Sequence, residues 1–179
     1  MKTLLTIALV AAGLLIYRSA NAGKPAAPAA NTPASLELSD QFEAPQRLSF
    51  PATGITLLTI ADRQGSEQIE GWVTPVKQRF GGRIDIRGIA DVSSVPAPLR
   101  SMVRKRFQKL QTHPVMMDWE GIAVKRFAPA AGKANILVLD SHGKTLARLS
   151  GEANASALQN LNGVIERALA DHKAKSAAK

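Results

Sequence analysis

Apolar residues along the chain follow patterns that predict alternating strands and helices. An unbroken apolar run at 55–61 (Ile-Thr-Leu-Leu-Thr-Ile-Ala) predicts a central strand covered on both faces. Helical spacing then predicts a helix with these residues facing inward: Ile69, Trp72, Val73, Val76 and Phe80. Ser66 is the expected N-cap, and Gly81 followed by Gly82 is expected to end the helix. Pro75 lies inside it and should kink it, because proline removes a backbone hydrogen bond.

The second half of the chain continues the alternation. A second strand is expected at 83–90, and an amphipathic helix at 99–110. The inward side of that helix should carry its apolar residues, Leu99, Met102, Val103, Phe107 and Leu110. Apolar runs at 135–139 and 145–149 predict a hairpin across a polar turn, and helical spacing predicts a last helix at 155–171.

Two short elements are expected between the amphipathic helix and the hairpin, an extended piece at 114–117 and a helical turn or two at 121–127. Parallel strands linked by helices need right-handed crossovers and layers on both faces of a sheet. The order of elements therefore predicts a three-layer α/β sandwich, with the hairpin as an antiparallel edge.

The first 22 residues have the pattern of an export signal: Lys2, an apolar run at 4–16, and Ala20-Asn21-Ala22 as a cleavage site. The apolar run is shorter than the roughly 20 residues that span a bilayer. We predict cleavage after Ala22 and a periplasmic protein. The alternative is an uncleaved N-terminal membrane anchor, which Tyr17-Arg18 behind the run favours.

The rest of the chain divides into three segments. Residues 23–35 are rich in Ala and Pro without a large apolar side chain, which predicts a flexible linker. Residues 36–172 are long enough for one domain with its own core. Residues 173–179 are expected to be a disordered tail.

Composition limits the chemistry that this chain can perform. It contains no cysteine, which excludes disulfides, thiolate nucleophiles and thiolate metal ligands. Loss of Lys2 and Arg18 with the signal lowers the basic residues from 23 to 21 against 14 acids, leaving a net charge of +7. This charge favours anionic partners. Nucleic acid is not expected as a partner, because an exported protein meets little of it.

Several local features occur in a recognisable order. A strand ending at Ala61 leads into a helix that contains Pro75, and an Asp-Trp-Glu-Gly turn follows at 118–121. The run at 136–140 is then followed by Gly143-Lys144. This order resembles the thioredoxin fold, in the version of peroxiredoxin-like and TlpA-like exported proteins, over about residues 36–171. The resemblance implies a three-layer α/β/α sandwich with a mixed sheet.

The catalytic features of that family do not carry over to this chain. Its members place a nucleophilic cysteine at the start of the first helix. Counting back from Pro75 puts Glu67 and Glu70 at the two cysteine positions, whereas counting forward from the strand puts Gln64 and Glu67 there. The family's cis-proline would fall at Ala134, where a trans bond is expected. We infer a non-redox relative with a degenerate active site.

Other candidate chemistry has simpler explanations. Ser66, Glu67 and Glu70 could bind a small ligand or act as an acid/base group, although a helix start explains them. Asp140-Ser141-His142 contains the residue types of a catalytic triad, but three consecutive turn residues do not adopt its geometry.

His113, Met116 and Met117 have donor types that suit copper. The adjacent methionines point to opposite faces of a strand, so core packing explains at least one of them. We predict no metal site. No motif indicates a cofactor, and none is expected.

One helix face is strongly basic. No acidic residue occurs at 92–117, and five cations lie on the polar side of the predicted helix: Arg100, Arg104, Lys105, Arg106 and Lys109. Like charges four residues apart slightly destabilise a helix, which is a hint of function. The candidate partners are an anionic ligand, an acidic periplasmic protein and an anionic membrane surface. The simpler explanation is a solvated face, whose cations could pair with acids elsewhere in the fold.

The sequence thus leaves three functional hypotheses. The first is a non-redox binding module, with the degenerate site and the basic helix as contact surfaces. The second is an enzyme that works without cysteine through Ser66 or Glu67. The third is a peripheral membrane protein that uses the basic helix.

Overall fold

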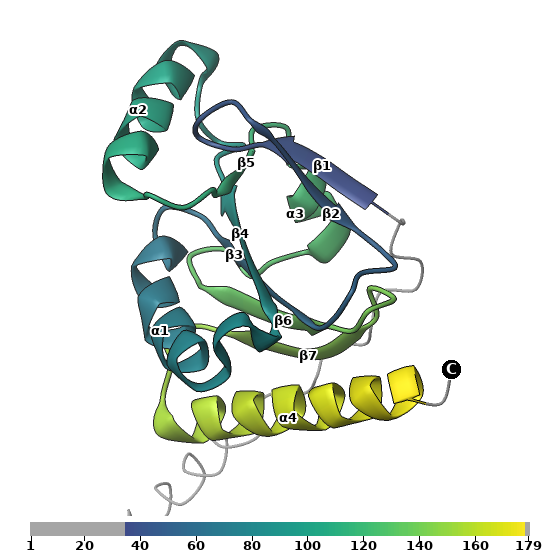
Figure 1. Cartoon of the computed structure of the whole chain (residues 1–179). Coiled ribbons are helices and arrows are strands. Elements are labelled where there is room, and N and C mark those ends of the chain that lie inside the picture. The colour runs from purple at the N-terminus through teal and green to yellow at the C-terminus, as the bar shows by residue number, and fades with distance from the viewer. Residues whose placement is uncertain (1–34, 178–179) are drawn as a thin grey trace, which may run out of the picture.

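The computed structural model describes residues 35–177, which form a five-stranded mixed sheet between two outer layers (Figure 1). The strand order is β5-β4-β3-β6-β7, with β3 in the centre. Strands β3, β4 and β5 are parallel, whereas β6 runs antiparallel to both β3 and β7. The strand bounds are β3 Thr56–Ala61, β4 Asp85–Asp91, β5 Met116–Asp118, β6 Asn135–Leu139 and β7 Thr145–Ser150.

Helices α1 (Ile69–Phe80) and α4 (Ala155–Ala177) cover one face of the sheet (Figure 1). Helix α3 (Ile122–Phe127) covers the other face, together with an N-terminal hairpin of β1 (Ser35–Ser39) and β2 (Pro45–Ser49). Short 3-10 turns precede α1 (η1, Gly65–Gln68), follow it (η2, Gly81–Arg83) and precede α2 (η3, Ala97–Leu99). The predicted three-layer α/β sandwich is confirmed.

The central strands separate two apolar cores, because successive side chains of a strand point to opposite faces. Leu57 packs with Trp72, Val76 and Leu161 under α1 and α4. Its neighbour Leu58 packs in the core that lies under α3 and the hairpin. Every residue of β3 is buried, as the unbroken apolar run predicted.

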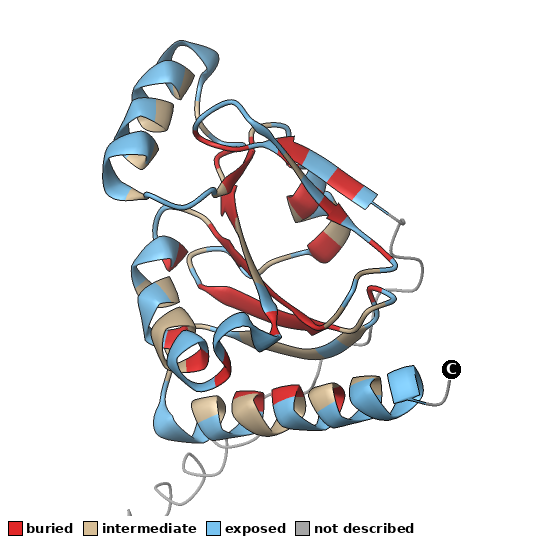
Figure 2. Ribbon diagram, viewed as in Figure 1, coloured by how far each residue is buried: buried red, intermediate tan, exposed pale blue. Residues whose placement is uncertain are grey.

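Helix α2 (Arg100–Leu110) differs from the other helices in its packing. It lies beside β4 and β5 and contributes no buried residue to a core (Figure 2). Its apolar residues Val103 and Phe107 are half-buried there, against Met117 and Trp119. The inward orientation predicted for three other residues is wrong: Leu99, Met102 and Leu110 are exposed by 45%, 61% and 65%.

Three further boundaries differ from the sequence predictions. The hairpin of β1 and β2 was not predicted, and Ser35, assigned to the linker, begins β1. Helix α4 continues through Ala177, so the tail predicted from 173 is helical up to that residue. The export signal and the rest of the linker lie outside the described residues. Within 35–177 no helix has the length and apolar character needed to cross a bilayer.

Candidate functional site: the helix start and the basic helix

The chain turns from β3 into α1 around the side chain of Asp62. Its Oδ1 accepts a hydrogen bond from the Gly65 N–H at 2.8 Å, and its backbone carbonyl accepts one from Ser66 at 2.9 Å. Its Oδ2 accepts a third, from the N–H of Gly132 at 2.6 Å. The predicted cap at Ser66 is therefore wrong: the Ser66 hydroxyl donates to the Arg63 carbonyl at 2.7 Å, and Asp62 holds the turn.

Gln68 makes a second connection to the segment before β6. Its Oε1 accepts a hydrogen bond from the Ala134 N–H at 3.0 Å, and its Nε2 donates to the Gly132 carbonyl at 3.5 Å. Ala134, where the sequence places the family's cis-proline, therefore has its N–H bonded within the chain.

Asn135 holds the same segment from the other side. It is 2% exposed, and its Oδ1 accepts a hydrogen bond from Ala130 N–H at 2.8 Å. Its Nδ2 donates to the carbonyls of Ile60, Ala130 and Lys133 at 3.3, 3.0 and 2.9 Å. A buried amide whose donors and acceptor are all bonded holds its surroundings firmly.

Gly65 brings the two backbones into direct contact. A Cβ at this position would lie 2.3 Å from both the carbonyl carbon and oxygen of Lys133, and 2.9 Å from the nitrogen of Ala134. Among residues 35–177 the only cis peptide bond precedes Pro51, so the bond before Ala134 is trans, as expected. We call this arrangement the helix-start network, formed by Asp62, Gly65, Gln68, Ala134 and Asn135.

Neither register counted from the sequence finds the residues that face Ala134. The two that do so are Gly65 and Gln68, which have the Cys-x-x-Cys spacing but lie one residue after the pair Gln64 and Glu67 and two residues before the pair Glu67 and Glu70. The predicted Gln64, Glu67 and Glu70 are exposed. Residues 65–68 form a 3-10 turn. Because such a turn has three residues per turn, Gly65 and Gln68 lie on the same side of it.

The other candidate sites are structural. Met116 and Met117 are buried in separate cores, as predicted from their adjacent positions, and His113 is exposed. Within the described chain no group of three or more His, Asp or Glu side chains is arranged to hold a metal ion.

Two aspartates hold turns. Asp140 accepts hydrogen bonds from the N–H groups of His142 and Lys144, so this carboxylate closes the hairpin turn. Asp118 is fully buried, and its two oxygens accept from the first backbone N–H groups of α3, those of Ile122, Ala123 and Val124.

Two arginines of the basic helix pair with acids of other segments, which is the alternative considered for this face. Arg100 pairs with Glu120 at 2.8 Å, and Arg104 pairs with Glu43 at 2.6 Å. Both guanidinium groups also stack over the Trp119 ring, at 5.4 and 5.7 Å from its centroid. These contacts fasten α2 to the domain.

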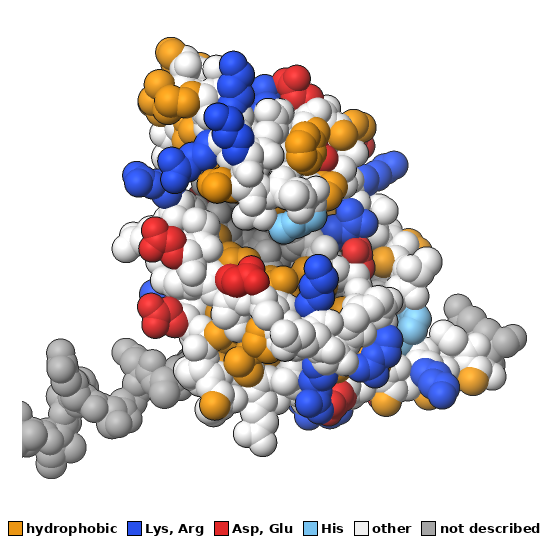
Figure 3. All heavy atoms as spheres, turned by 60° about the vertical axis from the view of Figure 1, so that its left-hand side comes forward, with side chains coloured by type: hydrophobic (Ala, Val, Ile, Leu, Met, Phe, Trp, Pro, Cys, Tyr) orange, Lys and Arg blue, Asp and Glu red, His pale blue; other side chains and the backbone are white. Residues whose placement is uncertain are grey.

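The other three cations of α2 remain accessible. Lys105, Arg106 and Lys109 are exposed and form no ion pair with any residue from 35 to 177. Figure 3 shows basic and apolar side chains interspersed over the upper part of this face, where α2 lies. We call the exposed side of this helix the α2 ridge, formed by Leu99, Met102, Lys105, Arg106, Lys109 and Leu110.

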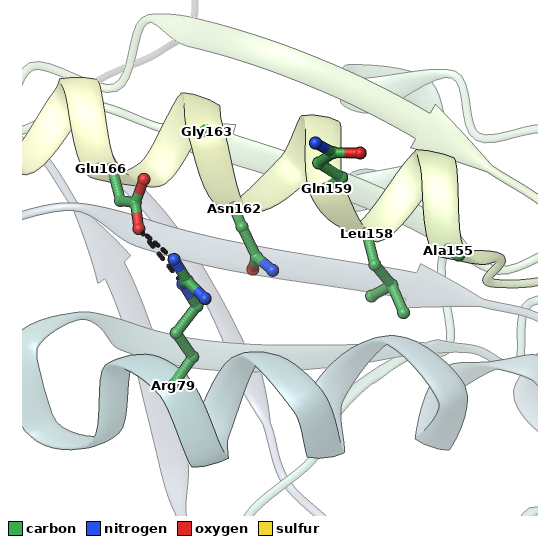
Figure 4. Close-up of a pocket in the computed structure, with 7 residues that line it drawn as sticks. All are labelled: Arg79, Ala155, Leu158, Gln159, Asn162, Gly163 and Glu166. Carbon is green, nitrogen blue, oxygen red and sulfur yellow. Dashed lines mark hydrogen bonds and ion pairs between the residues drawn. The ribbon is translucent and has the colours of Figure 1, made fainter.

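A shallow depression lies elsewhere, between α1 and α4. Arg79 and Glu166 bridge it with an ion pair of 2.6 Å, and Leu158 and Asn162 line it (Figure 4). None of the residues that line this depression belongs to the helix-start network or to α2.

The side chain of Arg148, on β7, lies beside the end of α3. Desolvation lowers the pKa of Arg148, whose guanidinium donates to the carbonyls of Phe127 and Ala128 at the end of α3. This contact serves to cap α3.

No protein-family model matches the chain, and no curated protein matches its sequence. Solved structures do match it. The exposed lipoprotein thioredoxin Etrx1 of Streptococcus pneumoniae aligns with a TM-score of 0.58 and 16% identity over 73% of this chain and 99% of that one. A putative thiol:disulfide interchange protein DsbE from Chlorobium tepidum aligns at 0.58 and 13% identity, over 75% and 93%. An uncharacterized protein from Geobacillus kaustophilus aligns at 0.57 and 14%, over 83% and 82%.

These similarities establish a thioredoxin-like fold, which confirms the family resemblance seen in the sequence. The class of protein is accordingly a thioredoxin-fold protein without cysteine. Two of these three fold neighbours are redox proteins by name, whereas this chain has glycine and glutamine at the helix start beside Ala134.

Proposed function

We propose that this chain is an exported, non-redox binding module that uses the thioredoxin fold to present a basic surface to an anionic partner. The observation that carries the proposal is the helix-start network. Where redox relatives have a nucleophilic cysteine at the helix start and a cis-proline before the penultimate strand, this chain has a glycine in backbone contact and an alanine whose N–H is bonded to Gln68. The basic surface is the set of unpaired cations on α2.

The network argues against chemistry at this position as well as against thiol exchange. An extended substrate cannot pair with the Ala134 amide unless it displaces Gln68. The hydroxyl of Ser66 is directed to the Arg63 carbonyl, and Glu70 accepts a hydrogen bond from the Thr74 hydroxyl. The alternative of an enzyme built on Ser66 and Glu67 therefore gains no support from this geometry.

A binding experiment tests the proposal. The full chain is titrated with fluorescent poly-glutamate, and anisotropy reports the complex. Lys105→Glu, Arg106→Glu and Lys109→Glu together should abolish binding. The matched control is Lys77→Glu, Lys125→Glu and Lys144→Glu, which changes the net charge equally at exposed lysines on other surfaces.

The control should retain most of the affinity, since its α2 ridge is intact. Equal losses in both triple variants would show that binding follows net charge alone, and would overturn the proposal. A thiol–disulfide exchange assay on the same protein should show no turnover; measurable turnover would also overturn it.

A further inference from the structure

We infer that the partner of the α2 ridge is an anionic lipid bilayer. This inference rests on the proposed function and names the partner of the same surface. We draw it from three properties of the α2 ridge: its positive charge, its exposed apolar side chains and its convex shape.

The ridge combines cations with long apolar side chains in one row. Leu99, Met102, Arg106 and Leu110 follow each other at spacings of three and four residues, which places them along one side of a helix. Lys105 and Lys109 are also four residues apart and form the adjacent row. Each apolar member of the ridge is at least 45% exposed.

The opposite side of the helix is fixed to the domain, so the ridge keeps its outward orientation. Arg100 and Arg104 pair with acids and stack on Trp119. The side chain of Gln108 donates to the Gln41 carbonyl at 2.7 Å, and the buried Gln41 side chain donates in turn to the carbonyl of Gln111. These contacts hold both halves of α2.

Shape and charge together favour a lipid surface over a folded acidic protein. A protein partner binds most tightly through anchors in desolvated pockets. The ridge instead is one convex helix side on which cations alternate with aliphatic chains, and residues 92–117 contain no acid. A fluid bilayer can receive the apolar chains between headgroups while lipid phosphates neutralise the cations, as in interfacial helices.

Vesicle co-sedimentation of the full chain tests this inference. Phosphatidylglycerol vesicles should bind the protein, whereas phosphatidylcholine vesicles should not. Reversal of Lys105, Arg106 and Lys109 to glutamate should lower the partition coefficient by at least about 100-fold, because each cation near an anionic surface contributes roughly a factor of five or more. The control reversal of Lys77, Lys125 and Lys144 should have a much smaller effect. Any effect of residues 1–34 is common to all variants.

A second measurement reports contact by the apolar residues. Met102→Trp should be quenched by brominated acyl chains in phosphatidylglycerol vesicles. Leu146→Trp is the matched control, because Leu146 is an exposed apolar residue on β7, and it should not be quenched. Equal quenching of both positions, or equal binding to the two lipids, would overturn the inference.

The experiments also separate the two proposals. Poly-glutamate binding that depends on the ridge, without any vesicle binding, would overturn the lipid inference and leave the proposed binding module intact, with an acidic protein as its partner. Loss of both kinds of binding would overturn both.

Discussion

Replacing Gly65 with alanine tests whether the helix-start network is closed by direct backbone contact. The new Cβ would lie 2.3 Å from the Lys133 carbonyl, more than 1 Å inside an ordinary contact of about 3.4 Å. Both neighbours are backbone atoms and cannot rotate away. The α1 start and the segment before β6 must therefore separate.

The expected cost follows from the contacts that this separation breaks. Overpacking of this kind costs about 1–3 kcal/mol. The hydrogen bonds from Gly132 to Asp62 and from Ala134 to Gln68 span the same gap, and each contributes about 1 kcal/mol. Together these effects should lower the free energy of unfolding by about 2–5 kcal/mol.

Urea denaturation followed by fluorescence of the buried Trp72 measures this change. Gly163→Ala in α4 is the matched control, because its Cβ would lie 3.4 Å from the flexible end of Arg167. That variant should be neutral or more stable by up to about 1 kcal/mol, since alanine favours helix. If Gly65→Ala unfolded at the same urea concentration as Gly163→Ala, the reasoning about the closed backbone contact would be refuted.

Three further variants probe individual contacts. Asp62→Ala should lower the unfolding free energy by about 1–3 kcal/mol in urea, whereas Ser66→Ala should change it by less than about 0.5 kcal/mol; the reverse order would restore Ser66 as the cap. Asn135→Ala leaves three carbonyls and an N–H without their partner, so a loss of about 2–4 kcal/mol is expected in the same assay, and a neutral result would contradict the role given to this amide. Arg104→Ala removes an ion pair and a stack on Trp119, and should speed amide hydrogen exchange in α2 with less than about 1 kcal/mol of global destabilisation; unchanged exchange would show that Arg104 does not fasten the helix.

The strands and helices found from the sequence were those with the strongest periodicity. The run at 55–61 and the first strand of the hairpin, at 135–139, are predictable because strands buried on both faces are almost wholly apolar. The β1–β2 hairpin escaped notice because its strands are five residues long, with two buried apolar residues in β1 and one in β2. For α2 the apolar spacing was correct, but periodicity does not reveal whether a neighbouring layer exists to cover Leu99, Met102 and Leu110.

The sequence by itself determined the fold class and the loss of thiol chemistry. Apolar periodicity is a local property of the chain, and the absence of cysteine is a matter of composition. Only the tertiary structure decided which residues meet between the start of α1 and the segment before β6. The contacts of Gly65 and Gln68 join residues more than 60 positions apart, and Asn135 bonds to the backbone of another strand. No local sequence pattern encodes such contacts.

The same distinction applies to the basic helix. Its five cations are equivalent in the sequence, since each lies on the polar side of one amphipathic pattern. The structure divides them, because Glu43, Trp119 and Glu120 approach from other segments and engage Arg100 and Arg104. The other three cations remain exposed because they lie on the side of α2 that faces solvent.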